Sequence, residues 1–217
     1  MIIPSYNEKN GIKEVVKTIF QKGLDVVVVD DGSSDNSADL AKQGGATVII
    51  HKINMGKGRS LQDGFDYAID RNYDAVITLD GDGQHRPEEI GRFIDKYEKE
   101  KPSIIIGNRM KDAKNMPALR RGTNIVMSYI VSKICKQNIP DSQCGYRLIS
   151  ADVLRKIKLL TSRYDAESEI LIKASRMRFR IDSVPISTVY EGQSSQINPV
   201  VDTVRFIKML IRILKGT

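Results

Sequence analysis

The stretch Asp25-Val-Val-Val-Val-Asp30-Asp31-Gly32-Ser33-Ser34-Asp35 decides the fold. Four consecutive valines are typical of a strand that is buried on both faces, and strands of this kind belong to parallel sheets. The polar residues that follow lie at the carboxyl end of the strand, where Ser34 or Asp35 can cap the next helix. This stretch therefore predicts a parallel β-sheet in which a helix follows the strand.

Strand and helix patterns alternate along the chain around this stretch. Apolar runs predict further strands, and stripes of apolar side chains at helical spacing predict the helices between them. The expected strands are residues 1–3, 46–50, 75–79, 103–107 and 180–186, and the expected helices are 12–20, 61–69, 87–100, 125–135, 151–159 and 165–177. This order predicts an α/β fold with right-handed crossovers and a mostly parallel central sheet flanked by helices. No internal repeat or second core is evident, so we expect a single domain over residues 1–217.

The polar segment after the strand at residues 75–79 carries the strongest chemical signal. Its sequence is Asp80-Gly81-Asp82-Gly83-Gln84. Side chains at positions i, i+2 and i+4 of an extended segment point the same way, so Asp80, Asp82 and Gln84 can converge. Gly81 and Gly83 allow a tight turn and leave room for a ligand. Carboxylate and amide oxygens are suited to Mg²⁺ or Mn²⁺, so we predict a metal site here, with a polar β-turn as the alternative.

Composition narrows the class of protein and of partner. The chain has 217 residues, 41% hydrophobic and 28% charged, which is typical of a soluble globular domain. A net charge of +7 favours an anionic partner, either a phosphorylated ligand or a membrane surface. Nucleic acid is not expected, because the chain has no Trp and no basic reading motif. Two cysteines exclude a disulfide framework, and no signal peptide or membrane-spanning run is apparent, so we expect a cytoplasmic or peripheral membrane protein.

These segments together suit a nucleoside diphosphate sugar. A metal at Asp80 and Asp82 would neutralise the pyrophosphate and stabilise the charge of the leaving group. Asp30 or Asp31 can accept hydrogen bonds from the base or the ribose, although a turn with a helix cap also explains them. Glu8, in the loop after the first strand, can accept from the ribose hydroxyls.

Three other residues carry weaker signals for the same ligand. Pro4 and Tyr6 are expected to form the wall beside the base. Lys57 can touch a phosphate, although a solvated lysine near a helix start is the more common case, and its surroundings lack the spacing of a P-loop. His51 has no evident partner in the sequence and is expected to be structural.

Four motifs in order carry a resemblance to a known family. They are Pro4-Ser-Tyr-Asn-Glu8, Val29-Asp-Asp-Gly-Ser-Ser34, Asn54-Met-Gly-Lys-Gly58 and Asp80-Gly-Asp-Gly-Gln84. The chain resembles glycosyltransferase family 2, and within it the polyprenyl-phosphate (dolichol-phosphate) sugar synthases. The resemblance implies the GT-A fold of nucleotide-diphospho-sugar transferases and an inverting transfer.

The resemblance also implies roles for particular residues. Asp30 and Asp31 would hold the nucleoside, and Asp80, Asp82 and Gln84 would hold the metal. The segments around the donor sugar and the acceptor would be Gly107-Asn-Arg109 and Gly145-Tyr-Arg147.

The nature of the acceptor decides which residues catalysis needs. A hydroxyl acceptor requires a general base, for which Asp141 is the candidate. A phosphate acceptor is already ionised and requires cations instead. Arginine binds two phosphate oxygens at once, and the candidates are Arg109, Arg120, Arg121 and Arg147.

The end of the chain resembles a helix that lies in a membrane interface. Residues 198–216 predict a basic amphipathic helix with Arg205, Lys208, Arg212 and Lys215 on one stripe. Residues 120–135 predict a second apolar helix that begins with basic residues. Packing against the core or a partner chain is the alternative for the terminal helix.

The sequence thus predicts a metal-dependent inverting glycosyltransferase. The expected reaction moves a sugar, with mannose from GDP-mannose as the first choice, to a dolichyl or undecaprenyl phosphate at the cytoplasmic face of a membrane. One alternative is a UDP-sugar-dependent transferase, for glucose or N-acetylglucosamine, acting on a glycan hydroxyl or a lipid phosphate. Another is a nucleotide-sugar-binding protein without turnover.

Overall fold

The computed structural model describes residues 1–113, 116–161, 165–187, 206–207 and 209–211. Within these residues one seven-stranded sheet has the order β3-β2-β1-β4-β6-β5-β7. The strands are β1 (Ile2–Ser5), β2 (Val27–Asp30), β3 (Thr47–Ile50), β4 (Ala75–Thr78), β5 (Ile104–Asn108), β6 (Arg147–Ser150) and β7 (Ile181–Pro185). The predicted α/β fold with a mostly parallel sheet is confirmed.

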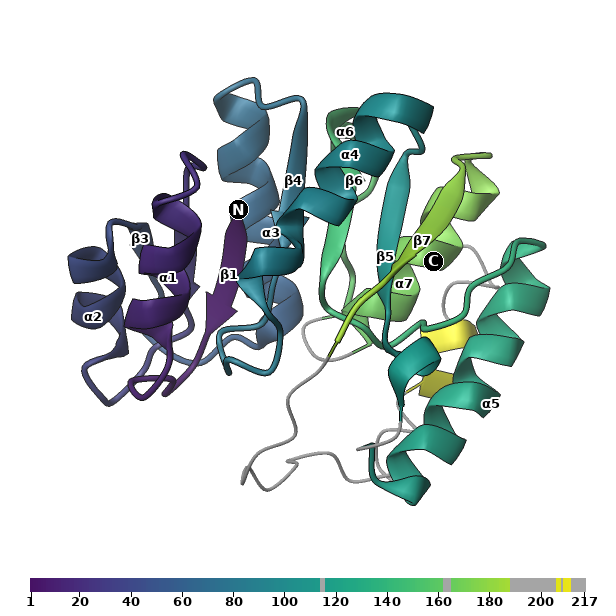
Figure 1. The fold of residues 1–217 in the computed structure, drawn as a ribbon, viewed down its shortest axis with the longest axis horizontal. Coiled ribbons are helices and arrows are strands. Elements are labelled where there is room, and N and C mark those ends of the chain that lie inside the picture. The colour runs from purple at the N-terminus through teal and green to yellow at the C-terminus, as the bar shows by residue number, and fades with distance from the viewer. Residues whose placement is uncertain (114–115, 162–164, 188–205, 208, 212–217) are drawn as a thin grey trace.

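Helices cover both faces of this sheet (Figure 1). They are α1 (Ile12–Phe20), α2 (Ser37–Gly44), α3 (Lys57–Asp70), α4 (Ile90–Glu100), α5 (Ala118–Cys135), α6 (Ala151–Lys156) and α7 (Ala166–Arg176), with short 3₁₀ helices η1 (Pro87–Glu89) and η2 (Arg109–Asp112). Helices α1, α2 and α4 lie on the near face in Figure 1, and α3, α6 and α7 lie on the far face. Helix α5 packs beside α7 at the end of the sheet nearer β5 and β7.

The valine run forms the inner strand β2, as its composition predicts. Each of its residues is buried, and the strand pairs in parallel with β1 on one side and β3 on the other. The following turn leads into α2, whose first residue Ser37 donates its backbone N–H to the Asp35 carboxylate at 2.9 Å. The N-cap residue of α2 is Asn36, and no side-chain hydrogen bond caps the helix there, so neither Ser34 nor Asp35 occupies the N-cap position that the sequence predicts.

Strand β1 continues through Pro4 and Ser5, which the sequence analysis places in a loop. Pro4 pairs with Val29 of β2 in the strand register. Proline is tolerated at this position because β4 pairs with β1 only at Ile2, so the other side of β1 is released beyond that point. The polar loop therefore begins at Tyr6, directly after the strand.

Strand β6 runs antiparallel to both of its neighbours, β4 and β5. An antiparallel strand begins at the edge where its neighbours end. Arg147, the first residue of β6, therefore lies opposite Thr78 and Ile106 near the carboxyl ends of β4 and β5. The reversal brings residues 141–146 to the same edge of the sheet as the segments that follow β4 and β5.

One predicted helix boundary changes, and the position of Pro185 at a strand end is as the sequence predicts. Helix α5 begins at Ala118 rather than at residue 125, so Arg120 and Arg121 lie in its first turn. Proline at position 117, directly before the helix, favours this earlier start. Pro185 ends β7, which is an edge strand of the sheet, as proline in a strand predicts.

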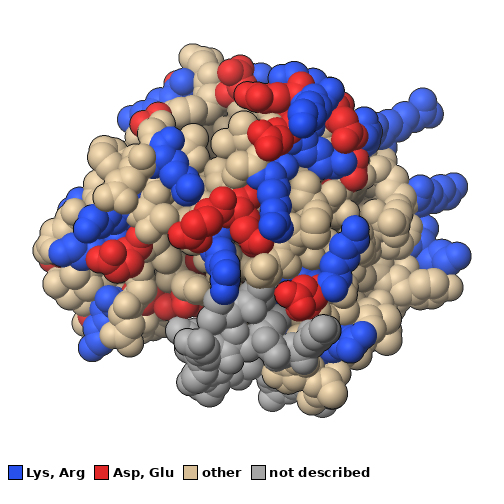
Figure 2. Space-filling view, in the orientation of Figure 1, with Lys and Arg blue, Asp and Glu red and all other residues tan. Residues whose placement is uncertain are grey.

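The predicted terminal helix lies largely outside the described residues. Its basic positions Arg205, Lys208, Arg212 and Lys215 are not among them. Phe206 and Met209 are buried in the hydrophobic core, whereas about half of Ile207 is exposed. No helix in the described part of the chain has the length and apolar character that crossing a bilayer requires. Basic and acidic side chains are intermixed over the face shown in Figure 2.

Candidate active site

Three carboxylates come together where β1 and β4 end. Burial, followed by the charges of Asp82 and Asp80, raises the pKa of Glu8 from its ordinary 4.5 to about 7. Burial and the charge of Asp80 also raise the pKa of Asp82. The Asp82 carboxylate accepts a hydrogen bond from the backbone N–H of Gln84 at 2.9 Å, which closes the turn. The cluster Glu8, Asp80 and Asp82 therefore concentrates negative charge at the carboxyl edge of the sheet.

Lys57 supplies the counter-charge to this cluster. Its Nζ lies 2.7 Å from Oδ1 of Asp80 and 2.5 Å from Oε1 of Glu167. Burial alone would lower the pKa of Lys57, but these two carboxylates outweigh burial and raise it. In turn Lys57 overcomes the effect of burial on Asp80 and lowers the pKa of that carboxyl group. The first residue of α3 is thus a fixed cation beside the first acidic residue after β4.

The donor set at this edge is suited to a hard divalent cation. Mg²⁺ is usually bound through one or two carboxylates together with water and substrate phosphates. Asp80 and Asp82 offer such a pair, with the amide of Gln84 two residues further on. The described residues contain no group of three or more His, Cys, Asp or Glu side chains that could hold a metal. The metal predicted from the sequence would therefore depend on two carboxylates and an amide.

The segment before β6 is pressed against the Asp80 side chain. A Cβ atom built on Gly145 would lie 2.7 Å from both carboxylate oxygens of Asp80. The carbonyl of Gly145 accepts a hydrogen bond from the hydroxyl of Thr78, in β4, at 2.6 Å. Only a residue without a side chain permits this approach. Gly145 therefore positions Asp80.

Asp30 and Asp31, predicted to hold the nucleoside, both have partners in the loops around them. Asp30 accepts hydrogen bonds from the hydroxyl of Ser33 at 2.6 Å and from its backbone N–H at 3.1 Å. Asp31 accepts from the backbone N–H groups of Met55 at 2.8 Å and Gly56 at 2.7 Å. The Asp31 carboxylate thus fastens the segment before α3 to the end of β2, and its contact with a nucleoside stays a prediction.

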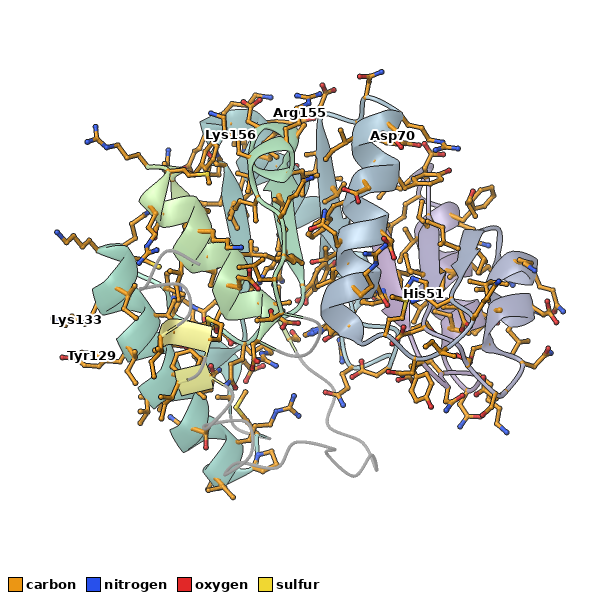
Figure 3. The ribbon with its side chains drawn as sticks, turned by 180° about the vertical axis from the view of Figure 1, so that it is seen from behind. His51, Asp70, Tyr129, Lys133, Arg155 and Lys156 are labelled. Atoms are coloured by element: carbon orange, nitrogen blue, oxygen red, sulfur yellow. The ribbon has the colours of Figure 1, made fainter. Side chains whose placement is uncertain are left out.

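His51 does have partners, which corrects the expectation from the sequence. Its Nδ1 lies 2.8 Å from Oδ1 of Asp31 and its Nε2 lies 2.9 Å from Oδ2 of Asp63. The imidazole lies between the sheet and α3 (Figure 3), and it ties the loop that carries Asp31 to the helix that begins at Lys57.

The remaining residues predicted around the donor lie beside the cluster. Pro4 is partly buried, whereas 46% of the Tyr6 surface is exposed. A Cβ atom on Gly81 would lie 3.5 Å from the carbonyl oxygen of Pro4, so the turn after β4 lies against the end of β1. His85 is buried, burial lowers its pKa to about 4, and its ring packs on Tyr146 at a centroid distance of 5.5 Å.

Asp141 and Arg109, predicted as alternative catalytic groups, form a buried ion pair with each other. The Asp141 carboxylate accepts from Nε of Arg109 at 2.7 Å and from Nη2 at 2.8 Å. It also accepts from the side-chain amide of Asn124 at 2.8 Å. Burial would raise the pKa of Asp141, but the charge of Arg109 outweighs it and the pKa is lowered. Asp141 is fully buried, and in this arrangement the carboxylate and the guanidinium group of Arg109 neutralise each other.

Arg147 and Arg121 lie in very different surroundings. Arg147 is 1% exposed and donates from Nε to the carbonyl of Cys144 at 2.7 Å and from Nη2 to that of Ser142 at 2.7 Å. Its third donor meets the carbonyl of Glu167. This geometry gives Arg147 a structural role and does not favour the predicted contact with an acceptor. Arg121 is exposed and lines a cavity beside α5.

Glu167 and Asn124 are two buried polar residues of the site that no sequence motif indicates. Glu167 lies in the first turn of α7, and its Oε2 is buried without a hydrogen-bond donor in the described part of the chain. Asn124 is a buried polar residue in α5. The one available signal for Asn124 was its position directly before an apolar stretch. A helix that begins at residue 118 places it on the inner face.

Comparison with known proteins places the chain in a family. The model of the family described as Glycosyl transferase family 2 matches residues 1–158. A UDP-N-acetylglucosamine–dolichyl-phosphate N-acetylglucosaminyltransferase of Methanococcus voltae is 32% identical over 217 aligned positions, covering 89% of this chain and 86% of the relative. An undecaprenyl-phosphate mannosyltransferase of Micrococcus luteus is 29% identical, covering 87% of this chain and 82% of the relative.

A solved structure shares the fold. Glucosyl-3-phosphoglycerate synthase of Mycobacterium tuberculosis, crystallised with Mn²⁺, UDP and phosphoglyceric acid, superposes with a TM-score of 0.74. The match covers 97% of this chain and 76% of the synthase at 16% identity, which shows the GT-A fold alone. With the family match over most of its length, the chain belongs to glycosyltransferase family 2 and is a glycosyltransferase.

Proposed function

We propose that the chain transfers a sugar from a nucleoside diphosphate donor to the phosphate of a polyprenyl phosphate, at the cytoplasmic face of a membrane. The observation that carries the proposal is the cluster Glu8, Asp80 and Asp82 beside Lys57, in a family 2 glycosyltransferase. Relatives named for dolichyl-phosphate and undecaprenyl-phosphate acceptors support the choice of acceptor.

Asp80 and Asp82 of the cluster would bind the diphosphate of the donor through a divalent metal. Mg²⁺ or Mn²⁺ held by Asp80, Asp82 and Gln84 would supply Lewis-acid neutralisation of the leaving diphosphate. Lys57 offers a second positive charge beside Asp80, and its ammonium group can donate to a phosphate oxygen. The free oxygen Oε2 of Glu167 can accept from a hydroxyl of the donor sugar, because a buried carboxylate oxygen requires a donor.

The nucleoside would lie over the ends of β1 and β2. The exposed ring of Tyr6 and the partly buried Pro4 offer an apolar wall for the base. Glu8 can accept from ribose hydroxyls, and Asp30 and Asp31 are the further residues proposed to contact the nucleoside. These two aspartates keep unused lone pairs after their internal hydrogen bonds, since an ionised carboxylate has about four acceptor sites.

The acceptor side supports a phosphate over a hydroxyl. A general base must turn a free lone pair toward the proton that it removes. The Asp141 carboxylate instead faces Arg109 and Asn124 in a fully buried site. A phosphate oxygen needs no base, and it would attack the anomeric carbon from the face opposite the leaving diphosphate, which inverts the configuration. Arg121, which is exposed, is the cation proposed to meet the phosphate.

The donor is proposed as GDP-mannose, with a UDP-sugar as the second candidate. The Micrococcus luteus relative is named as a mannosyltransferase. The Methanococcus voltae relative is named for UDP-N-acetylglucosamine, which favours the second candidate. Base and sugar selectivity depend on the shape of the donor pocket, so a direct comparison of donors decides between them.

A donor screen tests the proposal. The purified chain is incubated with undecaprenyl phosphate, Mn²⁺ and one of GDP-mannose, UDP-glucose or UDP-N-acetylglucosamine, and nucleotide release is measured with and without the lipid. Lipid-dependent release from one donor, abolished by EDTA, is the expected result. If a glycan hydroxyl supports release and the lipid phosphate does not, the proposed acceptor is wrong.

A further inference from the structure

A cavity of about 720 Å³ lies beside α5, outside the carboxylate cluster. It is bounded by the outer side of α5 and by residues 136–140, which follow that helix. Its size is typical of sites that bind small organic ligands. Met110 and Arg121 line it, and Met110 directly follows Arg109 of the buried ion pair. We call this cavity the α5 groove.

Carbon surfaces form much of its wall. Ile125 and Tyr129 line the groove from α5, and they are 50% and 63% exposed. Ile139 and Pro140 line it from the following segment. Tyr129 lies on the outer side of α5 in Figure 3. Such a surface is suited to a ligand with hydrocarbon character.

Several polar side chains of the groove are already paired with the protein. Ser128 donates to the Asn124 side chain at 3.1 Å, and Ser132 donates to the carbonyl of Ile139 at 3.1 Å. The amide of Gln137 bonds to the backbone of Phe179 at 3.0 Å and of Ile181 at 2.9 Å. Because these groups are satisfied by the protein, the groove does not require a polar ligand along its length.

The charges around the groove have one sign. Arg121, Lys133 and Lys136 line it, and none of the described residues in its lining is acidic. Nζ of Lys133 lies 5.4 Å from the centre of the Tyr129 ring. In Figure 2 the surface over α5 is mostly uncharged, with basic side chains at its edge. An apolar wall with a basic rim complements a hydrocarbon chain that carries an anionic head.

We propose that the α5 groove binds the isoprenoid units next to the phosphate of the acceptor, with the phosphate at the Arg121 end. This inference rests on the proposed function, since it assigns a binding surface to the same acceptor. The groove also shares hydrogen bonds with the acceptor side of the active site, because Ser128 contacts Asn124, which contacts Asp141. Tyr129 lies two turns, about 12 Å, along α5 from Arg121, so it would meet only an acceptor longer than one isoprene unit.

A comparison of acceptor lengths tests the groove. Tyr129→Ser is assayed with a 55-carbon polyprenyl phosphate and with a five-carbon prenyl phosphate. The KM for the long acceptor is expected to rise about fivefold or more, as for loss of an aromatic anchor, while the KM for the short acceptor stays the same. The matched control is Phe20→Ser, which removes an aromatic ring of similar exposure from α1.

Equal KM values for the long acceptor in wild type and Tyr129→Ser would overturn the groove and leave the proposed function standing. No transfer by the wild type to either acceptor would instead overturn the proposed function itself.

A binding measurement without turnover separates the remaining occupants. The chain has no Trp, so Tyr129→Trp introduces a single reporter, with Phe20→Trp as the control. Micelles with 55-carbon polyprenyl phosphate are expected to shift the emission of Tyr129→Trp to shorter wavelength, and micelles without it are not. An equal shift with anionic vesicles that lack the acceptor would assign the surface to the membrane. A shift that follows protein concentration without lipid would assign it to a second copy of the chain. Either result overturns the proposal.

Discussion

Asp141 forms a buried ion pair with Arg109 and also accepts from Asn124. Replacing it with Asn removes the carboxylate charge from this buried pair. Breaking a buried pair from one side costs about 3–5 kcal/mol, so Asp141→Asn is expected to lower the free energy of unfolding by that amount in urea titrations. The control is Glu100→Gln, which removes a carboxylate charge from exposed ion pairs with Arg180 and Lys96 and should change the free energy of unfolding far less than Asp141→Asn.

A different result for Asp141→Asn would identify a catalytic role. A variant with the stability of the wild type, unchanged donor affinity and a severe loss of kcat would identify Asp141 as a general base. That result would favour the hydroxyl acceptor.

Glu8 makes stability depend on pH. Its pKa is about 7 in the folded chain against an ordinary 4.5. Between these values the folded state binds a proton that the unfolded state has released, so the stability that Glu8 contributes is present at low pH and is lost as pH rises to about 7. Glu8→Gln removes this dependence. In metal-free buffer, the free energy of unfolding of the variant relative to wild type should therefore rise as the pH is raised from 5 to 8. The same difference between variant and wild type at pH 5 and at pH 8 would contradict this.

The site residues were predictable from the sequence where several of them belong to one short motif. Asp80 and Asp82 belong to one short motif, and the structure brings Glu8 to them from the end of the adjacent strand. The partners of His51 were missed because Asp31 and Asp63 lie 20 and 12 residues away in the sequence. Partnerships at such separations follow from the packing of helices on the sheet, which a local pattern does not contain.

At the scale of elements, the segment directly before β6 contacts the end of β4, and this contact sets the position of Asp80. An alanine at Gly145 would place its Cβ 2.7 Å from the Asp80 carboxylate and displace it. A displacement of about 1 Å at a catalytic group can cost about 100-fold in rate, so we expect a loss of that size in kcat/KM for Gly145→Ala, with weaker Mn²⁺ binding by calorimetry. Gly91→Ala in α4 is the control, since nothing lies within 4 Å of its added Cβ.

If Gly145→Ala keeps the wild-type rate and Mn²⁺ affinity, the segment before β6 can shift away without displacing the Asp80 carboxylate. The carboxylate would then be positioned by Lys57 alone.

The order of elements was predictable because buried strands and amphipathic helices have distinct periods. The direction of β6 was not predictable, since a short buried strand such as Arg147–Ser150 carries no mark of its orientation. The start of α5 was placed too late because polar residues at 120–124 conceal the helical stripe. Both misses concern the acceptor side of the sheet, where the alternation of strand and helix breaks down.

At the scale of the whole molecule, ligand binding and folding are linked. A ligand that binds only the folded state at about 100 times its Kd adds about 2.7 kcal/mol of stability. For a chain of this length that corresponds to a rise in Tm of about 5–10 °C, which we expect for the correct nucleoside diphosphate with Mn²⁺ in thermal unfolding. The nucleotide with EDTA should give a much smaller rise, and Asp82→Ala should remove the difference. A full rise without metal would contradict the predicted ligand set.

The carboxylate of Asp31 has a consequence beyond the loop that it fastens. By accepting from Met55 and Gly56 and facing His51, it gives the segment before α3 a fixed shape in the free protein. The conformational entropy of that segment is therefore lost when the chain folds. If the donor binds at this edge of the sheet as proposed, its affinity is not reduced by the cost of ordering the segment.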